Sequence, residues 1–339
     1  MAETIGICVI GCGRAGLIHA KNFATGVPGA RLVALADPVK EALAEAGESL
    51  GVSSLYSDPA QAIKDPCVHA IVVACPTILH KDIVVAAAGA GKHILCEKPM
   101  ATTPSDCRQM IAASEKARVK LQIGFMRRFD RGFQGAKEAV DRGDIGQVVS
   151  VKSLTHGPSI PKPWTFDLRV SLGPLAEVSS HDIDTIRWIT ASEFREVYAI
   201  AGNYRCPDAE ANFPDYYDNV MLLASLDNGM QGFVGGAVSV RYGYDARVEV
   251  LGQRGIVFIG ELSGGSFAVC NDQGAMARPI VKSWSNLFAE AYLREDAGFI
   301  ECILQDKTPA ATGYDGMMAV KVVEAGNRSI AEKRPVRLG

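Results

Sequence analysis

A lysine directly follows an apolar run that is typical of a buried strand, and it could take part in chemistry. The run His93–Cys96 is followed by Glu97-Lys98-Pro99. An ammonium group at the end of a strand can donate a hydrogen bond to a substrate oxygen and stabilise the negative charge that develops there. A solvated loop with a turn-forming proline would contain the same residues. The rest of the chain decides between these two interpretations.

A glycine-rich motif near the N-terminus could hold the phosphates of a dinucleotide. The segment Gly11-Cys12-Gly13-Arg14-Ala15-Gly16 fits the pattern G-x-G-x-x-G and joins an expected strand to an expected helix. The first glycine permits the tight turn, the second lets a pyrophosphate approach the backbone, and the third lets the helix pack on the strand. We predict that Gly11, Gly13, Arg14, Ala15 and Gly16 bind the cofactor. The alternative is a glycine-rich turn in an α/β domain that binds another ligand.

An acidic residue indicates which dinucleotide is bound. Asp37 lies 21 residues after Gly16, at the end of the second expected strand. A carboxylate there can accept hydrogen bonds from the ribose hydroxyls and would repel a 2′-phosphate. Pro38 occupies the position where an NADP enzyme could offer an arginine. These residues favour NAD over NADP, and the second half of the chain has no feature that is specific for a flavin.

Strand and helix signals alternate through the first 125 residues, which predicts a parallel, doubly wound sheet. The segment His69–Cys75 is apolar after its first residue, as expected for a parallel strand covered on both faces. The expected strands are Thr4–Ile10, Arg31–Ala36, Ser53–Tyr56, His69–Cys75, His93–Cys96 and Lys120–Phe125, and the expected helices are Arg14–Thr25, Val39–Leu50, Pro59–Lys64, Thr77–Ala90 and Pro104–Ala117. We therefore expect a Rossmann domain over residues 1–125.

Three loops of this domain should meet at one edge, because ligands of doubly wound sheets bind beyond the carboxyl ends of the strands. These loops carry His80, Lys98 and Arg127. The residues expected at the cofactor are Cys75, Pro76, Thr77, His80, Glu97 and Lys98. His80 could instead be a helix-start histidine that is bonded to the backbone.

The pattern changes after about residue 126, where strand signals follow one another and turn residues such as Asp227-Asn228-Gly229 separate some of them. We expect an α+β domain over residues 126–339, with a large, mainly antiparallel open sheet and helices on one face. Its last helices could pack back on the first domain. The expected strands are Val148–Leu154, Glu196–Ala201, Asn219–Leu226, Gln231–Val240, Ala246–Gly252, Ile256–Ile259 and Phe267–Cys270, and the expected helices are Arg131–Arg142, Ser180–Ile189, Asn286–Gln305 and Asp315–Glu332.

Taken together, these motifs resemble the glucose–fructose oxidoreductase / inositol dehydrogenase / MocA family over essentially the whole chain. The resemblance rests on the glycine-rich start, on Glu97-Lys98-Pro99 and on the segment Ser179–Asp184. The segments Gly124–Asp130 and Tyr242–Arg247, and the helix start at Asp315-Gly316, are similar to inositol dehydrogenases in particular.

The resemblance implies that Lys98 and His181 face the nicotinamide. His181 would then be the general base that removes the hydroxyl proton, and Lys98 would donate to the same oxygen. Glu177, four residues before His181, could accept its other ring N–H if both residues are helical. The family's inositol dehydrogenases usually have Asp at that position, and their Ser-Gly-Gly turn is here Ser171-Leu172-Gly173. The alternatives are an ordinary helix-start histidine and an exposed glutamate.

Further polar side chains would be needed to bind a polyhydroxylated ring. Arg127, Trp164, Asp167 and Tyr242 (or Tyr244) are the candidates. Trp164 could stack on a sugar ring, or it could simply be buried in a proline-rich loop. Asp182 and Asp184 are expected as helix-start charges that the helix dipole favours, although Asp184 could also reach the substrate.

We therefore predict an enzyme that oxidises a secondary hydroxyl of a cyclic polyol or sugar with NAD, similar to inositol dehydrogenases. Within enzymes, the alternative is a pyranose or sugar-acid dehydrogenase of the same family. The alternative from another class is a non-catalytic NAD-binding regulatory protein, which would be expected to have lost Lys98 or His181.

Composition excludes several other classes. The net charge is −3 and the pI is about 6.1, which gives no reason to expect nucleic acid or an anionic membrane as partner. The nine cysteines are scattered without a C-x-x-C pair, so we expect reduced thiols in a cytoplasmic protein and no metal site. MAETIG lacks the basic start of a signal peptide. The family resemblance suggests a homodimer or homotetramer formed through the C-terminal sheet.

Overall fold

The chain folds into two compact units. The computed structural model describes residues 4–264, 268–270, 273 and 276–339. Unit 1 consists of Met1–Phe129 and Glu290–Val320, and unit 2 consists of Asp130–Ala289 and Lys321–Gly339. Unit 1 therefore combines the N-terminal part of the chain with a segment from late in the sequence.

Unit 1 contains a six-stranded sheet in which all neighbouring strands are parallel. The strand order is β3-β2-β1-β4-β5-β6, so the order reverses between β1 and β4. Ligands of doubly wound sheets bind beyond the strand ends at such a reversal. The strands are β1 Ile5–Ile10, β2 Ala30–Ala36, β3 Ser54–Tyr56, β4 Ala70–Val73, β5 His93–Glu97 and β6 Leu121–Gly124.

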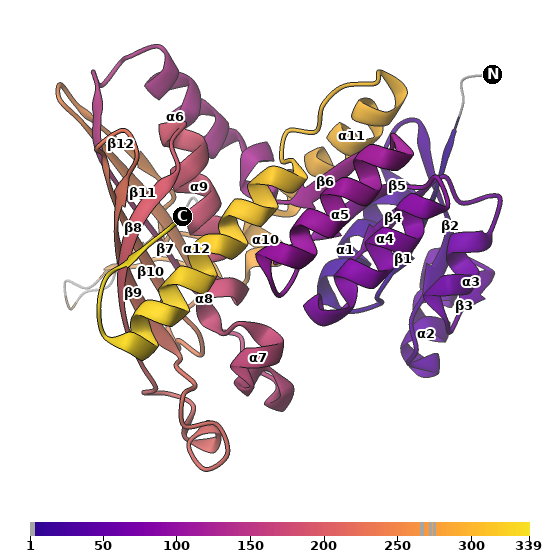
Figure 1. The fold of residues 1–339 in the computed structure, drawn as a ribbon, viewed down its shortest axis with the longest axis horizontal. Helices are drawn as coiled ribbons and strands as arrows, with labels where there is room; N and C mark the ends of the chain where they lie inside the picture. Colours follow the sequence, from indigo (N-terminus) through magenta and orange to yellow (C-terminus); the bar gives the residue numbers. More distant parts are fainter. Residues whose placement is uncertain (1–3, 265–267, 271–272, 274–275) are drawn as a thin grey trace. The chain divides into compact units, whose positions relative to one another are not determined.

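Helices cover both faces of this sheet (Figure 1). The helices α1, α2 and α11 share one apolar core with β1 and β2, in which Val9, Phe23, Leu35, Leu43 and Phe299 are buried. On the other face α4 packs on β4, β5 and α5. The bounds are α1 Arg14–Thr25, α2 Lys40–Leu50, α3 Pro59–Lys64, η1 Thr77–Leu79, α4 His80–Gly89, α5 Pro104–Ala117, η2 Met126–Phe129 and α11 Ala289–Leu304.

Local sequence explains where several of these helices begin. Thr103 caps α5 by accepting a hydrogen bond from the Asp106 amide, and Asp58 caps α3 by accepting one from the Ala60 amide. Each cap is followed by a proline, which has no N–H to leave unsatisfied in the first turn. By contrast, α1 starts at Gly13 without a side-chain cap and has no acidic residue in its first turn.

Unit 2 contains a seven-stranded sheet of order β12-β11-β7-β10-β9-β8-β15. The pair β7–β10 is parallel and the other neighbouring pairs are antiparallel. The strands are β7 Val148–His156, β8 Phe194–Gly202, β9 Asn219–Leu226, β10 Gln231–Ala237, β11 Asp245–Gly252, β12 Ile256–Ile259 and β15 Val336–Arg337, and β13 Val269–Cys270 and β14 Met276–Ala277 form a separate two-stranded sheet.

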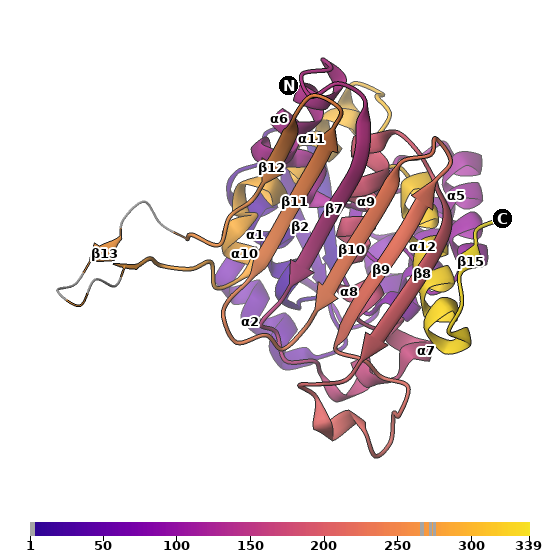
Figure 2. The same ribbon diagram turned by 90° about the vertical axis from the view of Figure 1, so that its left-hand side faces the viewer.

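One face of the seven-stranded sheet carries helices, and the opposite face is turned toward the viewer in Figure 2. The helix α9 packs on β7 and β10, and α8 packs on β9 and β10. The later part of α12 lies close enough that a Cβ on Gly326 would meet Leu175 and Leu222. The helices are α6 Arg131–Asp141, η3 Pro163–Phe166, α7 Leu168–Ser171, α8 Pro174–Glu177, α9 Ser180–Thr190, η4 Pro207–Ala209, α10 Trp284–Leu287 and α12 Gly313–Glu332.

The predicted fold class is confirmed: a doubly wound parallel sheet is followed by a mainly antiparallel one. The helix expected over Asn286–Gln305 is divided into α10 and α11. The strand expected over Gln231–Val240 ends at Ala237, shortly before Ser239 adopts a positive φ of 58°. Of the strand expected over residues 267–270, the structure gives β13 at Val269–Cys270, and residue 267 lies outside the described residues.

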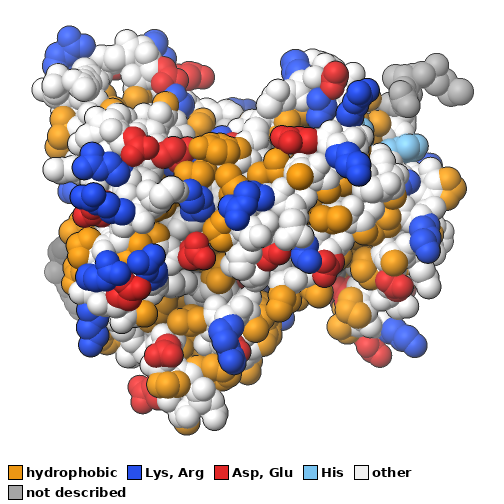
Figure 3. Space-filling model, viewed as in Figure 1, with side chains coloured by type: hydrophobic (Ala, Val, Ile, Leu, Met, Phe, Trp, Pro, Cys, Tyr) orange, Lys and Arg blue, Asp and Glu red, His pale blue; other side chains and the backbone are white. Residues whose placement is uncertain are grey.

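Charged side chains of both signs are interspersed on the face of the molecule shown in Figure 3. This distribution matches the small net charge of −3. Among the helices of the described chain, none has the length and apolar character needed to cross a membrane.

Candidate functional site

The glycine-rich turn lies at the reversal of strand order in unit 1. The Gly11 amide donates to the carbonyl oxygen of Ala36, and the Ala74 amide donates to that of Ile10. These bonds connect the turn to the ends of β2 and β4. Gly11 has a φ of 104°, and a Cβ there would lie 2.6 Å from the Ala74 carbonyl oxygen. Glycine at this position is therefore required by the fold itself.

The other two glycines of the motif differ in what surrounds them. A Cβ on Gly16 would lie 1.8 Å from the carbonyl oxygen of Gly11, so close packing of α1 on the turn requires glycine there. A Cβ on Gly13 would meet nothing within 4 Å, and Gly13 has an ordinary φ of −79°. The described protein therefore gives no steric reason for glycine at position 13. The open space at the N-terminus of α1 fits the close approach of a pyrophosphate.

Asp37 supports the same turn. Its Oδ2 accepts a hydrogen bond from the Cys12 amide at 2.7 Å, and its Oδ1 accepts one from the Val39 amide at 2.8 Å. Each carboxylate oxygen has a second lone pair. Asp37 thus holds the turn and still has lone pairs on both oxygens.

The loop after β4 is tied to the lysine loop by His80. The ring Nε2 lies 2.8 Å from the Cys75 carbonyl oxygen, and Nδ1 lies 3.0 Å from that of Pro99. Burial lowers the pKa of His80, so the neutral ring is favoured. A neutral ring carries a single N–H, so His80 donates to one of these two backbone carbonyls and only contacts the other, and its ring lies between the two loops. This geometry corresponds to the backbone-bonded alternative of the sequence analysis.

Lys98 is half-buried, directly after β5, and the Lys98–Pro99 peptide bond is cis. Its backbone N–H donates to Oε2 of Glu97 at 3.1 Å. Glu97 is buried and its Oε1 faces Nε2 of His19 at 3.1 Å. Both carboxylate oxygens of Glu97 therefore have partners within unit 1.

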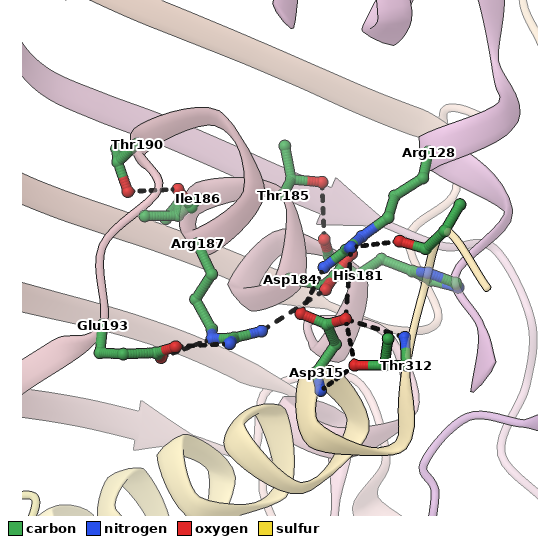
Figure 4. A network of polar contacts seen from close by, with 11 residues as sticks. Arg128, His181, Asp184, Thr185, Ile186, Arg187, Thr190, Glu193, Thr312 and Asp315 are labelled. Atoms are coloured by element: carbon green, nitrogen blue, oxygen red, sulfur yellow. Dashed lines mark hydrogen bonds and ion pairs between the residues drawn. The ribbon is translucent and has the colours of Figure 1, made fainter. Parts of the chain in front are cut away.

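Arg127 and Arg128 lie in η2, directly after β6, and both are buried. Arg128 is fixed by its own unit: its guanidinium donates to the Ala310 carbonyl oxygen at 2.6 Å and contacts Asp315 at 2.9 Å. Asp315 also receives the amide and the hydroxyl of Thr312, as Figure 4 shows. This network fixes η2 and thereby the backbone that carries Arg127.

In unit 2, His181 lies in the first turn of α9 and is buried. Its carbonyl oxygen accepts a hydrogen bond from the Thr185 hydroxyl at 2.7 Å, also visible in Figure 4. Asp182 lies in the first turn of α9, as expected of a helix-start charge, but both it and Asp184 are buried. Asp182 is buried and receives the Ser153 hydroxyl from β7 at 2.6 Å, so it anchors α9 on the sheet.

Asp184 is likewise buried, and its Oδ1 lies 3.8 Å from a guanidinium nitrogen of Arg187. Arg187 makes two shorter contacts of 2.6 Å with Glu193, so Glu193 is its main partner (Figure 4).

Glu177 is the last residue of α8, and residues 178–179 separate it from α9. The two residues therefore do not lie one turn apart on a single helix, and the i−4 argument for their contact does not apply. Just upstream, Leu172 adopts a left-handed conformation with a φ of 61°. The family's glycine would adopt this conformation without strain.

The predicted substrate-binding residues of the loop before α7 have different surroundings. Trp164 is 43% exposed in η3, so it is not a core residue. Asp167 caps α7 and forms two hydrogen bonds with the Arg169 guanidinium, at 2.9 and 2.7 Å. Arg169 and the backbone amide lower the pKa of Asp167. Asp167 thus has a structural role at the start of α7.

Tyr242 belongs to a polar chain that starts on β7. Its hydroxyl lies 2.5 Å from Nδ1 of His156 and 3.2 Å from Oδ2 of Asp245. Arg247 holds the Asp245 carboxylate at 2.7 and 2.9 Å. Burial, and then Asp245, raise the pKa of Tyr242 to about 12, so its hydroxyl keeps its proton and can donate to Asp245.

This geometry assigns a tautomer to His156. Tyr242 has one hydroxyl proton, and it donates this proton to Asp245. The Tyr242 oxygen must then accept a hydrogen bond from His156, so His156 carries its proton on Nδ1. Burial lowers the pKa of His156, and the ring is neutral with an acceptor lone pair on Nε2. His156 is half-buried and was not predicted. Its position two residues after the expected strand Val148–Leu154 was the available signal.

Comparisons with known proteins match the chain in two consecutive parts. Residues 5–125 match a model described as "Oxidoreductase family, NAD-binding Rossmann fold", and residues 137–338 match one described as "Oxidoreductase family, C-terminal alpha/beta domain". Both models carry the name GFO/IDH/MocA. Together they cover most of the sequence.

Individual relatives match over nearly their full length. The chain is 35% identical to a myo-inositol 2-dehydrogenase of Thermotoga maritima, with 98% of each chain covered. It is 33% identical to a scyllo-inositol 2-dehydrogenase (NAD(+)) of Bacillus subtilis, over 100% of this chain and 97% of that one. A crystal structure of scyllo-inositol dehydrogenase from Lactobacillus casei, with bound NAD(H) and scyllo-inositol, matches with a TM-score of 0.90 at 27% identity over 99% of both chains.

Proposed function

The chain belongs to the GFO/IDH/MocA oxidoreductase family, and from this premise we propose that it oxidises a secondary hydroxyl of an inositol with NAD. The observation that carries the proposal is its full-length similarity to inositol 2-dehydrogenases together with the presence of both Lys98 and His181. A regulatory protein without catalysis would have no need to keep both residues.

NAD would be held at the carboxyl edge of the unit 1 sheet. The pyrophosphate would bind at Gly13, where a Cβ would meet nothing, and along the turn from Gly11 to Gly16. Asp37 would accept a ribose hydroxyl, and the loop Cys75–Thr77 would flank the dinucleotide. When bound, NAD supplies the acceptor for the hydride that leaves the ring carbon.

Lys98 and His181 would both act on the reacting hydroxyl. His181 accepts the hydroxyl proton, and Lys98 donates a hydrogen bond to the oxygen as negative charge develops there. The Lys98 backbone is fixed through Glu97, and His181 is fixed in the first turn of α9. Glu177 would orient His181 only across the break between α8 and α9.

The remaining ring hydroxyls would be bound by further polar side chains. Arg127 and Asp184 are buried and offer donors and an acceptor, respectively. The Nε2 lone pair of the neutral His156 can accept a further hydroxyl proton, and Tyr242 holds that ring in place. Trp164 would offer an exposed ring face, and Asp167 an acceptor, at the rim of the site.

NAD should be preferred over NADP, because the Asp37 carboxylate would repel a 2′-phosphate and binds the backbone of its own loop. We expect kcat/KM with NADP to be roughly a hundredfold lower or more. Steady-state kinetics with the two cofactors at the same inositol concentration check this expectation. Equal use of both cofactors would contradict the role of Asp37.

The proposal extends to assembly and location. The exposed face of the unit 2 sheet carries large apolar side chains, including Ile200, Leu223 and Phe258, which suits a homodimer or homotetramer formed through it. The described cysteines are all free thiols. They would remain so in the reducing cytoplasm, where NAD is available.

NADH formation with a panel of substrates tests the function. The panel contains myo-inositol, scyllo-inositol, glucose, other aldoses and their acids. We expect turnover with at least one inositol at a kcat/KM roughly tenfold or more above that of every aldose. Failure of all inositols under conditions where an aldose or acid reacts would overturn the proposal.

A pyranose or sugar-acid dehydrogenase is the second candidate. It is favoured by Glu177, which replaces the family's usual aspartate, and by Leu172, which replaces a glycine although its φ is 61°. Both changes lie in the segment that leads into α9. The same substrate panel separates the two candidates.

A further inference from the structure

A fully buried polar cluster adjoins Lys98 within unit 1. Its members are His19 of α1, Glu97 of β5, and Glu295 and Asp296 of α11, and we call them the His19 cluster. The exposed fractions are 0% for His19, Glu295 and Asp296, and 5% for Glu97. No role has been given above to His19, Glu295 or Asp296.

His19 forms a bridge between two carboxylates. Its Nδ1 lies 2.6 Å from Oδ1 of Asp296, and its Nε2 lies 3.1 Å from Oε1 of Glu97. Asp296 is held on its other oxygen by the side-chain amide of Asn22 at 2.8 Å. The ring also packs edge-on against Tyr292, with the ring centroids 5.4 Å apart. The orientation of the imidazole is thus fixed on every side.

The contacts indicate where the protons lie. A carboxylate can only accept, so both ring nitrogens of His19 must donate, which requires the imidazolium. Burial lowers the pKa of His19, but the charge and hydrogen bond of Asp296, and then of Glu97, outweigh it and raise that pKa well above its ordinary value. Burial also opposes ionisation of Glu97, yet His19 lowers its pKa overall.

Glu295 differs from the other acids of the cluster. Within the described part of the chain, neither of its carboxyl oxygens has a hydrogen-bond partner. Burial, and then the charge of Glu97, raise the pKa of Glu295 well above its ordinary value, so the neutral acid is favoured. Burial raises the pKa of Asp296, while the charge and hydrogen bond of His19 and the hydrogen bond of Asn22 oppose that rise. With Glu295 neutral, the His19 imidazolium lies between the carboxylates of Asp296 and Glu97.

The cluster is connected to Lys98 through Glu97. Oε1 of Glu97 faces His19, and Oε2 accepts the Lys98 backbone N–H at 3.1 Å. Gly124 on β6 leaves room for this carboxylate, since a Cβ there would lie 3.0 Å from its Cδ. A single carboxylate orientation therefore satisfies both His19 and the lysine loop.

Stability alone does not account for such an arrangement. Burial of charged pairs is expensive, and apolar residues of the same volume are often equally stabilising. A cluster that holds one carboxylate in one orientation can instead fix the position of the residues at a neighbouring site.

We propose that His19 is a positioning residue for the reaction: held by Asp296, its imidazolium orients Glu97, and Glu97 fixes the backbone at Lys98. The kinetic part of this inference rests on the proposed polyol oxidation. The protonation state of His19 and the order at the Lys98 amide do not depend on it.

The protonation state is measured by NMR on full-length protein labelled with ¹⁵N at its six histidines, with the His19 signals assigned from a His19→Gln variant. We expect both ring nitrogens to stay protonated from about pH 6 to about pH 9, because the carboxylates of Asp296 and Glu97 face the ring. The other titratable groups of these elements next to the cluster are Glu295, which is neutral, Tyr292 and Lys98. Glu295→Gln, which preserves a neutral group of similar shape, should leave these signals in place. A ring that loses a proton within this range would overturn the inference.

Hydrogen exchange at the Lys98 amide measures how firmly the backbone is held at this residue. Labelling with ¹³C-carbonyl glutamate and ¹⁵N-lysine selects the three Glu-Lys pairs of the chain, at 97–98, 115–116 and 332–333. In His19→Gln we expect hydrogen exchange at Lys98 to accelerate roughly tenfold or more, and the other two amides to keep their rates. An unchanged Lys98 rate would refute the positioning role.

Kinetics complete the test. We expect His19→Gln to lower kcat for the inositol roughly ten- to hundredfold while both KM values stay within about threefold. Ser114→Ala is the matched control, because Ser114 is also buried in unit 1 but bonds only the Met110 carbonyl within its own helix. A kcat loss no larger than in this control would overturn the inference.

Two further results would be decisive. A stoichiometric metal ion in the wild type that is lost in His19→Gln would show that the cluster binds a cation instead. A wild type that oxidises no polyol would refute the proposed function, and the two NMR measurements would then still decide whether His19 orders the lysine loop.

Discussion

Lys98 and His181 owe their positions to different local causes. Lys98 follows a buried strand, and its backbone is held by the side chain of the preceding residue, Glu97. His181 belongs to the first turn of α9, which Asp182 anchors on the sheet through Ser153. In each case a buried carboxylate next to the residue fixes the backbone.

Removal of either residue should reduce turnover strongly. We expect Lys98→Met and His181→Gln each to lower kcat/KM for the inositol by roughly 10²- to 10⁴-fold. The double variant should be only slightly worse than either single variant, because groups that act on one hydroxyl are not independent. NADH affinity, measured by fluorescence titration, should change no more than a few-fold.

Lys116→Met serves as the control, since Lys116 is an exposed lysine of α5 in the same unit. It should retain turnover within about twofold. Additive losses in the double variant would mean that Lys98 and His181 act on different steps.

At the scale of elements, the glycine-rich turn contains one glycine that packing requires and another for which only the proposed ligand gives a reason. Gly16 is needed by the contact between α1 and the turn, whereas Gly13 has open space where a Cβ would point. Both glycines fit the same sequence motif, so the motif does not tell which glycine serves packing and which serves the phosphates. The atoms around each position do tell.

Alanine at the two glycines should therefore have opposite effects. Gly13→Ala should leave the urea unfolding midpoint unchanged and weaken NADH binding roughly tenfold or more, because a methyl group fills the space that the pyrophosphate needs. Gly16→Ala should cost about 1–3 kcal/mol of stability through overpacking against the Gly11 carbonyl. Unaltered NADH affinity in Gly13→Ala would disprove the assignment of the phosphate site.

His80 joins two loops of the cofactor edge and provides a pH-dependent element. Burial lowers its pKa, so the unfolded chain binds a proton near the ordinary value of about 6.5 that the folded chain does not. Its contribution to stability is thus present above this value and decreases as the pH falls below it.

The expected outcome is a wild type that loses stability between about pH 7 and about pH 5, and a His80→Asn variant that loses less over the same interval. Urea unfolding at several pH values measures the difference. His19 cannot produce this loss, because its pKa is raised and its stabilising contact persists at low pH. Parallel curves for the two proteins would rule out His80 as the source.

At the scale of the whole molecule, the unit 2 sheet has one face without helices (Figure 2). Register brings Tyr198 beside Leu223, and Ile200 beside Met221, across β8 and β9. These four side chains are 40% to 59% exposed. An apolar area of this kind on a sheet favours association with another protein surface.

A charge placed on this face should disrupt the proposed oligomer. We expect Leu223→Glu to shift the protein from dimer or tetramer to monomer in light scattering coupled to size-exclusion chromatography, since an unpaired carboxylate would be buried at the contact. Val85→Glu, at an exposed position of α4 in unit 1, should leave the mass unchanged. A monomeric wild type would refute the proposed assembly.

Local patterns were sufficient for most elements and for the strand ends that meet at one edge of the unit 1 sheet. Apolar runs, glycines and prolines predicted nearly every strand and helix, because these features act over a few residues. The motif, Asp37 and Lys98 could be placed at one edge because parallel strands direct their carboxyl ends the same way. Family resemblance added His181.

Only the tertiary structure decided which side chains meet across long sequence separations. His19 and Asp296 are 277 residues apart, and His156 and Tyr242 are 86 apart, so no local pattern could pair them. It also showed that α8 ends at Glu177 and that Asp182 is buried. The physical reason is the same in each case: periodicity tells how one segment alternates between core and solvent, whereas a hydrogen bond between segments depends on where packing brings both backbones.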